Sequence, residues 1–226
     1  MNAIDQTRSR QLHPSVQVSP VIFVLDDDSS VREALESLIH NAGWVVETFA
    51  SAYEFLCRPR QLTSGCLILD LNLPQISGLE LQRLLADRTE MPIVFTSRYP
   101  DIAATVQAMK AGAVEFLTKP LDDQLVLSAV RQAIHRSQAA LERQAELQGL
   151  TNRFATLSPR EREVMRLVTI GLLNKQVGAE LGISEVTVKA HRGKVMRKMQ
   201  ARSLAQLVRL VEQLQLTGIH QELILA

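Results

Sequence analysis

The sequence predicts a doubly wound α/β domain with a five-stranded parallel sheet, followed by a small all-α helix-turn-helix domain. Short apolar runs alternate five times with helix-like segments in the first half, which is typical of a parallel sheet with helices on both faces. Three of these runs end in charged residues, as buried parallel strands do when their carboxyl ends open into a site. The charge also changes, from 10 basic and 15 acidic residues over 21–137 to 12 basic and 6 acidic residues over 151–226. The basic half is therefore the expected contact for nucleic acid.

The composition excludes several classes of protein. The 226 residues are 46% hydrophobic and 22% charged, which suits a folded protein of one or two domains. No apolar run approaches the ~20 residues needed to span a membrane, so no membrane association is expected. Cys57 and Cys66 make neither a disulfide framework nor a metal set, which favours the cytoplasm. Residues 1–20 lack the apolar core of a signal peptide and are expected to form a disordered arm.

The first domain is expected to contain five short strands, at residues 21–25, 44–48, 66–70, 92–96 and 114–118. Apolar residues at helical spacing and terminal residues mark the helices between them. Ser29 or Ser30 is the expected N-cap of the first helix, and Gly43 follows its last turn. The later helices are expected over 51–57, after the turn Pro74–Gly78, over 101–111 before Gly112, and from Leu121 onward.

A long helix is expected after the last strand, because residues 121–150 contain no proline and no glycine before Gly149. Residues 137–153 are interpreted as a linker helix between a first domain over 21–136 and a second over 154–226. One interpretation of its apolar spacing is a pairing seam between two copies, formed by Leu127, Val130, Ile134 and Leu141. The alternative is a solvated linker whose first half packs on the sheet.

The second domain is expected to contain four helices. Ser158 begins the first as its N-cap, with Pro159 as the first helical residue. The other expected N-caps are Asn174 for a helix over 175–181, Ser184 for one that runs to about Met199, and Ser203 for the last. Two short helices joined by a glycine turn, of which the second is basic, indicate a helix-turn-helix.

Charged and hydroxyl side chains follow the strands of the predicted sheet. Asp26 and Asp27 come after the first strand, Asp70 ends the third, Thr96 ends the fourth, and Lys119 follows the last. Because ligands of open α/β sheets bind outside the carboxyl ends of the strands, we expect these side chains to converge. Clustered carboxylates repel each other unless a cation compensates, and Mg²⁺ fits because it prefers hard oxygen ligands. A single acid at a strand end is more often a cap, but the complete set favours a site.

These residue types suit phosphoryl transfer. Asp27 and Asp70 are the expected direct Mg²⁺ ligands, the backbone carbonyl of Asn72 is a further one, and Asp26 would hold a metal-bound water. Once a metal neutralises charge, a carboxylate can act as a nucleophile toward a phosphoryl group. The lysine and the threonine would contact the phosphate oxygens.

The order of these residues resembles the receiver domain of two-component response regulators, with the motifs Asp26-Asp27, Asp70 before Leu73-Pro74 and Gly78, Thr96, and Lys119-Pro120. The stretch 108–117 is similar to the FixJ branch, whereas the segment 97–101 is a residue longer than is common there. The resemblance implies that Asp70 accepts phosphate from a sensor histidine kinase and that Asp26 and Asp27 bind Mg²⁺. It also implies that Thr96 and Phe116 respond to the phosphoryl group, although Phe116 could also be a core residue.

Six basic residues lie between Ser184 and Arg202, most of them on the third helix of the second domain, and only Glu185 opposes them: Lys189, Arg192, Lys194, Arg197, Lys198 and Arg202. Such a run is usually a solvated face, but the second helix of a helix-turn-helix enters the major groove. Segments 157–164 and 183–192 resemble the LuxR-type DNA-binding domain. That resemblance implies that Lys189, Ala190 and Gly193 contact DNA bases. It also implies that Lys175, Thr187 and Arg192 contact DNA phosphates. Lys194 belongs to the same DNA-binding surface.

Together these features predict a phosphorylation-activated, DNA-binding transcriptional regulator that is not an enzyme. Its expected partners are a sensor histidine kinase, double-stranded promoter DNA, a second copy of the phosphorylated chain, and RNA polymerase as a further contact. One rival is a Mg²⁺-dependent phosphohydrolase that passes through an aspartyl-phosphate, but that class usually has a second acid where this chain has Asn72. Another is a scaffold that binds DNA constitutively, against which the intact acid set argues.

Overall fold

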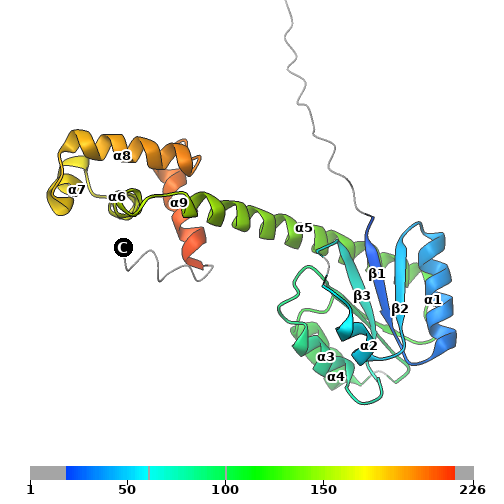
Figure 1. The fold of residues 1–226 in the computed structure, drawn as a ribbon. Coiled ribbons are helices and arrows are strands. Elements are labelled where there is room, and N and C mark those ends of the chain that lie inside the picture. The colour runs from blue at the N-terminus through cyan, green and yellow to red at the C-terminus, as the bar shows by residue number, and fades with distance from the viewer. Residues whose placement is uncertain (1–18, 61, 100, 217–226) are drawn as a thin grey trace, which may run out of the picture. The chain divides into compact units, whose positions relative to one another are not determined.

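A computed structural model describes residues 19–60, 62–99 and 101–216, which divide between two compact units at Leu141 and Glu142 (Figure 1). The expected disordered arm over 1–20 lies outside the described residues, apart from its last two. No helix of the described residues is long and apolar enough to cross a membrane.

The first unit contains a parallel sheet of five strands in the order β2-β1-β3-β4-β5. The strands are β1 (Val21–Leu25), β2 (Val45–Phe49), β3 (Gly65–Asp70), β4 (Ile93–Ser97) and β5 (Glu115–Thr118). All five expected strands are therefore confirmed, and four have an end shifted by one residue. The shift matters at β4, because Ser97 and not Thr96 is its last residue.

Helices cover both faces of this sheet, which confirms the doubly wound fold (Figure 1). Alternating strand residues face opposite ways, as Ile22 and Phe23 do in β1. The Ile22 face packs against α1 (Ser29–Asn41) and the start of α5 (Asp123–Ala155). The Phe23 face packs against three short helices, α2 (Ala52–Cys57), α3 (Gly78–Leu84) and α4 (Ile102–Lys110).

Two expected helix starts in this unit are wrong. Asp28, not Ser29 or Ser30, caps α1, and its carboxylate accepts a hydrogen bond of 2.9 Å from the Ser30 N–H. Helix α5 begins at Asp123, two residues after the expected start, because the Asp122 carboxylate accepts hydrogen bonds from the two N–H groups of residues 124 and 125. An aspartate is favoured at both places since it also interacts with the positive end of the helix dipole.

Helix α5 contributes to the cores of both units. Val130 and Ile134 are buried against the sheet with the apolar residues of α1, so neither is available for the pairing seam considered above. The first half of the helix therefore packs on the sheet, as the alternative interpretation required. Leu150 and Phe154, near the other end of the helix, are buried in the core of the second unit.

The second unit adds four helices to this core: α6 (Pro159–Thr169), α7 (Asn174–Leu181), α8 (Glu185–Lys198) and α9 (Leu204–Leu216). The side chains of Ser158, Ser184 and Ser203 each accept a hydrogen bond from an N–H group three residues later, which confirms them as caps. Asn174 is not a cap, because it is the first residue of α7 and its side chain binds Arg192 instead.

The turn between α7 and α8 packs tightly against α7. A Cβ atom at Gly178 would lie 2.7 Å from the backbone oxygen of Ile183, so this position requires glycine. Gly182 ends α7 in the left-handed conformation, with φ of +64°. A short turn with a fixed backbone conformation therefore joins α7 to α8, which confirms the helix-turn-helix.

Candidate functional site

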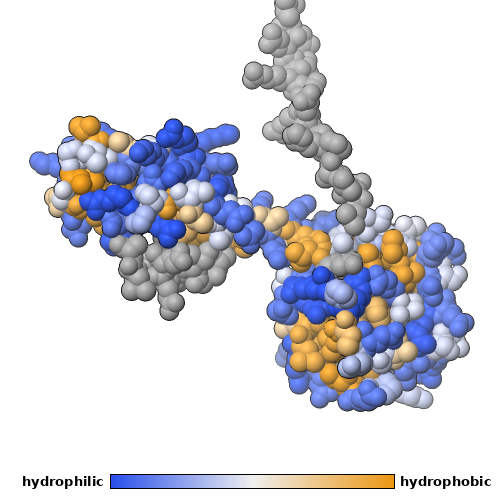
Figure 2. Space-filling view, in the orientation of Figure 1, coloured by the Kyte–Doolittle hydropathy of each residue, from blue (hydrophilic) through white to orange (hydrophobic). Residues whose placement is uncertain are grey.

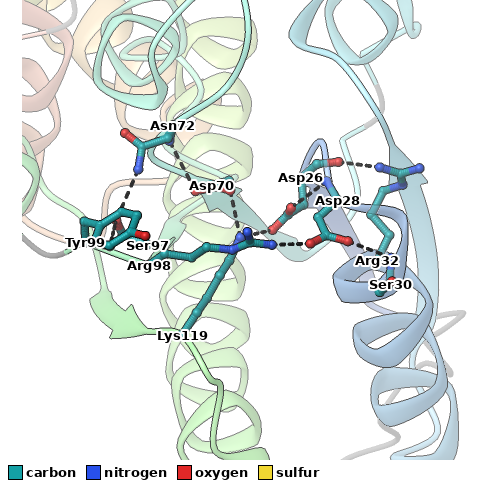
Figure 3. A network of polar contacts seen from close by, with 10 residues as sticks. All are labelled: Asp26, Asp28, Ser30, Arg32, Asp70, Asn72, Ser97, Arg98, Tyr99 and Lys119. Atoms are coloured by element: carbon teal, nitrogen blue, oxygen red, sulfur yellow. Dashed lines mark hydrogen bonds and ion pairs between the residues drawn. The ribbon is translucent and has the colours of Figure 1, made fainter.

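Lys119 joins two aspartates at the carboxyl ends of the central strands (Figure 3). Its ammonium nitrogen Nζ lies 2.6 Å from Asp26 Oδ2 and 2.7 Å from Asp70 Oδ2. Asp26 follows β1, Asp70 ends β3, and Lys119 follows β5, so the sheet order brings together residues that are distant in sequence. The lysine side chain is only 6% exposed, and its two partners are buried as well.

Loop N–H groups orient the other oxygens of the two carboxylates. The Asp28 N–H donates to Asp26 Oδ1 at 3.0 Å, and the Asn72 N–H donates to Asp70 Oδ1 at 3.2 Å. Each carboxylate therefore has one oxygen bound by the lysine and one by the loop that follows its own strand. This arrangement fixes the side chains before any ligand binds.

The burial of this cluster shifts two pKa values. Burial raises the pKa of the Asp26 carboxyl, although the hydrogen bonds from Lys119 and the Asp28 N–H act against the rise. Burial alone would lower the pKa of the Lys119 amine, but the hydrogen bonds to Asp26 and Asp70 raise it above its ordinary value. The lysine is therefore a permanent cation at neutral pH.

Three carboxylates of this cluster can approach a single ion. Asp26, Asp27 and Asp70 each offer an oxygen, and these atoms lie within 4.8 Å of one another. Asp27 is exposed, so the cluster is open to solvent on one side. An open pocket of 530 Å³ adjoins it, lined by Asp27, Asp28, Asp70, Asn72, Arg98 and Tyr99. The donor set consists of hard oxygen atoms, which is what Mg²⁺ requires.

Thr96 lies beside Asp70 in the sheet, because the two residues are register partners on β3 and β4. Its side chain is fully buried, and the hydroxyl oxygen has no hydrogen-bond partner among the described residues. Phe116 occupies the neighbouring strand β5, where it is half-buried and its ring stacks on Phe95 at 6.2 Å between ring centroids. Both residues expected to respond to the site therefore lie on strands next to it.

Three residues of the segment 97–101 also lie at this edge, although the sequence assigned none of them a role in the site. Arg98 forms a salt bridge with Asp28 across the pocket, and Ser97 Oγ accepts hydrogen bonds from the Asn72 amide at 3.4 Å and the Tyr99 N–H at 3.2 Å (Figure 3). The available signal was their position directly after Thr96, at the end of a strand that borders the site.

The predicted nucleic-acid surface lies on α7 and α8 of the second unit. Lys175, Lys189, Ala190, Gly193 and Lys194 are exposed, whereas Thr187 and Arg192 are half-buried. Val188 is fully buried in the core, so the opposite side of α8 packs inward. Figure 2 shows a mainly hydrophilic surface over α8.

Several side chains of this surface already have partners within the unit. Lys189 Nζ lies 3.1 Å from Glu185 Oε1, one helical turn earlier on α8. Arg192 donates a hydrogen bond of 3.1 Å to Asn174, which links α8 to the start of α7. Thr187 is held near the cap of α8 by a hydrogen bond of 2.8 Å with the Ser184 hydroxyl.

Comparison with known proteins assigns a family to each unit. The family model for the response regulator receiver domain matches residues 22–131, and the model for bacterial regulatory proteins of the luxR family matches residues 155–211. Nodulation protein W of Bradyrhizobium diazoefficiens is 46% identical over 211 residues, which are 93% of each chain. The response regulator protein TodT of Pseudomonas putida is 45% identical over 195 residues, which are 86% of each chain.

Two solved structures of similar proteins cover most of the chain. The low-resolution structure of response regulator StyR is 46% identical with a TM-score of 0.75, over 86% of this chain and 99% of that one. Full-length FixJ from B. japonicum is 38% identical with a TM-score of 0.52, over 87% and 98%. The chain therefore belongs to the FixJ/NarL family of two-component response regulators, DNA-binding transcriptional regulators with a receiver domain and a LuxR-type helix-turn-helix domain.

Proposed function

We propose that Asp70 accepts a phosphoryl group from a sensor histidine kinase and that this modification activates DNA binding by the second unit. The observation that carries the proposal is the setting of Asp70. Its carboxylate lies at the edge of an open pocket, 2.7 Å from the Lys119 ammonium and beside the unpaired hydroxyl of Thr96. The carboxylate is a nucleophile for the phosphoryl group, and the ammonium and the hydroxyl are placed to bind the phosphoryl oxygens after the transfer.

The transfer itself exchanges one bond for another. A carboxylate oxygen of Asp70 forms a bond to phosphorus while the phosphorus–nitrogen bond of a phosphohistidine breaks, and the imidazole leaves with the electron pair. Lys119 stays close to the accepting carboxylate because it is also bound to Asp26. The loop N–H of Asn72 holds the second oxygen and so limits rotation of the carboxylate.

The carboxylates Asp26, Asp27 and Asp70 fit Mg²⁺, and the nearby backbone carbonyl of Asn72 is proposed as a further ligand. When bound, the ion would neutralise the charge of the phosphoryl oxygens. Asp26 is already oriented by Lys119 and the Asp28 N–H, so it would act through a metal-bound water. Asp27 is exposed and would bind the ion directly.

Thr96 and Phe116 are proposed to transmit the modification. The Thr96 hydroxyl would donate to the phosphoryl group, which supplies the partner it lacks. Movement of Thr96 would alter the space beside Phe116, since the two residues lie on adjacent strands. Phe116 packs against the core cluster that includes Ala108 of α4, so the change would reach that helix. A ligand shifts such an equilibrium only through its different interaction with the two states.

DNA binding is assigned to the exposed side of α8. Lys189, Ala190 and Gly193 are proposed to face base edges, because they lie on the exposed side of the recognition helix. Lys175, Thr187, Arg192 and Lys194 are proposed to contact phosphates, which position the domain without specifying sequence. Two such domains in a phosphorylated homodimer would bind half-sites about one helical turn apart. The cytoplasm is the proposed location because the promoter is there, with RNA polymerase as a further contact.

The phosphohydrolase alternative gains no support. Such an enzyme needs an acid or base to activate water after the phosphoryl group is transferred. The residue two positions after Asp70 is Asn72, whose side-chain amide is neither an acid nor a base near neutral pH and donates to Ser97 Oγ at 3.4 Å. The helix-turn-helix unit would also have no role in hydrolysis.

Acetyl phosphate with Mg²⁺ provides the direct test. The full chain is expected to acquire one phosphate that hydroxylamine removes, and its affinity for DNA selected from a random pool is expected to rise. Asp70→Asn should abolish both effects, whereas Asp87→Asn, at an exposed acid of the same unit, should preserve both. Unchanged labelling of Asp70→Asn would contradict the proposal.

A further inference from the structure

A salt bridge spans part of the mouth of the pocket that contains Asp70. Arg98 comes directly after β4, and its guanidinium pairs with the carboxylate of Asp28 in the loop between β1 and α1 (Figure 3). Both residues line the same pocket as Asp27 and Asp70. The pair therefore joins two loops that border the site from opposite sides.

This salt bridge can be exchanged at little cost. The Arg98 side chain is 57% exposed, and exposed ion pairs add little to stability because water and salt screen them. Asp28 does not depend on Arg98 for its structural role, since its carboxylate also accepts the capping hydrogen bond from the Ser30 N–H at 2.9 Å. Opening the pair would leave α1 capped.

Phosphorylation would change the charge balance of the pocket. The three carboxylates Asp26, Asp27 and Asp70 are matched by Lys119 and a divalent ion. Transfer to Asp70 replaces a carboxylate of charge −1 by a phosphoryl group of about −2. The pocket gains about one negative charge that Lys119 and the ion do not balance. Among the described residues that line this pocket, Arg98 is the cationic side chain.

We infer that Arg98 is an exchangeable second cation of the site, paired with Asp28 before phosphorylation and with the phosphoryl group on Asp70 afterwards. This inference rests on the proposed role of Asp70. The planar guanidinium can donate two parallel hydrogen bonds to two oxygens of one phosphoryl group, whereas the ammonium of Lys119 already donates to two aspartates. The exchange ties the segment after β4 to the phosphoryl group and releases Asp28. Because Arg98 follows Thr96 by two residues, both groups would pull the same strand end toward Asp70.

Opposite effects of the two partners distinguish this exchange from a structural salt bridge. The probe is beryllofluoride, a stable phosphoryl analogue, titrated with Mg²⁺ into the full chain and followed by ¹⁹F NMR. Arg98→Gln should weaken its binding about tenfold, because a charge-assisted contact is lost. Asp28→Asn should strengthen binding about threefold, because Arg98 no longer has a competing partner. Asparagine also caps helices, so α1 should remain intact.

The double variant and a charge control complete the test. In the Arg98→Gln background, Asp28→Asn should have no further effect. Arg83→Gln, which removes an exposed arginine from α3, should bind as the unmodified chain does. A gain from Asp28→Asn that persists without Arg98 would show a general charge effect and overturn the inference, as would equal losses in both single variants. Failure of the unmodified chain to bind beryllofluoride would overturn the role of Asp70 as well, whereas normal binding with silent Arg98 variants would overturn the exchange alone.

Discussion

Thr96 lies beside Asp70 across the β3–β4 pair, and its buried hydroxyl has no hydrogen-bond partner among the described residues. A buried polar group without a partner costs ~1–3 kcal/mol of stability, so such groups are uncommon in folded proteins. This loss of stability is explained if the Thr96 hydroxyl acquires a hydrogen-bond partner in the phosphorylated state. The register of the sheet puts Thr96 beside Asp70, and a phosphoryl group on Asp70 is the proposed partner.

Replacement of this hydroxyl should separate stability from signalling. Thr96→Val keeps the shape of the side chain and removes the unpaired group, so the unmodified protein should be as stable as before or more stable by ~1 kcal/mol. Its DNA affinity should no longer respond to beryllofluoride with Mg²⁺. Urea denaturation and DNA titration measure the two effects, with Thr96→Ser as the variant that retains the response. A Thr96→Val protein that responds normally would exclude Thr96 from the switch.

Lys119 should be needed to transmit phosphorylation rather than to accept it. Lys119→Ala leaves the Asp70 carboxylate and the loop N–H that orients it, so the variant should still be labelled by acetyl phosphate. The ammonium that joins Asp26 to Asp70 is lost, so the phosphoryl group would not be drawn into the site. Phosphorylation-dependent DNA binding should therefore disappear. Normal stimulation of DNA binding in this variant would reduce Lys119 to a structural role.

Two basic residues of α8 should differ in what they contribute to DNA binding. Lys189→Ala should cost ~1–3 kcal/mol at selected sequences and less at random DNA, because it removes a proposed base contact. Arg192→Ala should weaken binding to selected and random DNA equally. It should also lower the slope of log affinity against log salt concentration by about one, as expected for a lost phosphate contact. Fluorescence titrations at several salt concentrations measure these quantities. Equal losses at selected and random DNA for Lys189→Ala would exclude base readout.

Arg192 also needs a control for structure, because it binds Asn174 at the start of α7. Asn174→Ala removes that contact and keeps the charge. It should leave the salt slope unchanged. If it reproduces the effect of Arg192→Ala, the arginine acts by holding α7 and not by contacting phosphate.

The stability of the second unit should fall in acid because of Glu161. Burial would raise the pKa of this carboxyl, but hydrogen bonds from Lys198 Nζ at 2.6 Å and the Ser158 N–H at 2.9 Å lower it below its ordinary value of 4.5. A lowered pKa in the folded state stabilises the fold at pH values above 4.5, and this contribution is lost as the pH falls through the lowered value. The free energy of unfolding of the unit should therefore decrease progressively as the pH falls below 4.5.

Urea denaturation of residues 142–226 between pH 7 and pH 3 checks this dependence, since these residues form a compact unit and contain most of a separate core. Glu161→Gln should cost ~1–3 kcal/mol at pH 7 and flatten the pH dependence. Glu180→Gln changes an exposed acid and should keep the original profile. An unaltered profile in Glu161→Gln would assign the acid sensitivity to other groups.

The sequence by itself determined the order and type of the elements. Short apolar runs identified the five strands, because a buried parallel strand is apolar on both faces. Gly43 and Gly112 were recognised as helix ends, and both have the positive φ that such a position requires. Ser158 and Ser184 were recognised as caps because a cap depends on hydrogen bonds within three residues of the chain. Local chemistry of this kind can be read directly from the residue order.

The sequence predicted that the aspartates and Lys119 converge at one edge of the sheet, but only the tertiary structure decided which side chains pair. Lys119 binds Asp26, which is 93 residues earlier in the sequence, and Arg98 binds Asp28, which is 70 residues earlier. These pairs form because the sheet order β2-β1-β3-β4-β5 brings the carboxyl ends of β1, β4 and β5 close to β3. The missing partner of Thr96 and the engagement of Asn174 by Arg192 likewise depend on neighbours that are distant in sequence. Such contacts follow from packing of whole elements, for which periodicity and spacing hold no information.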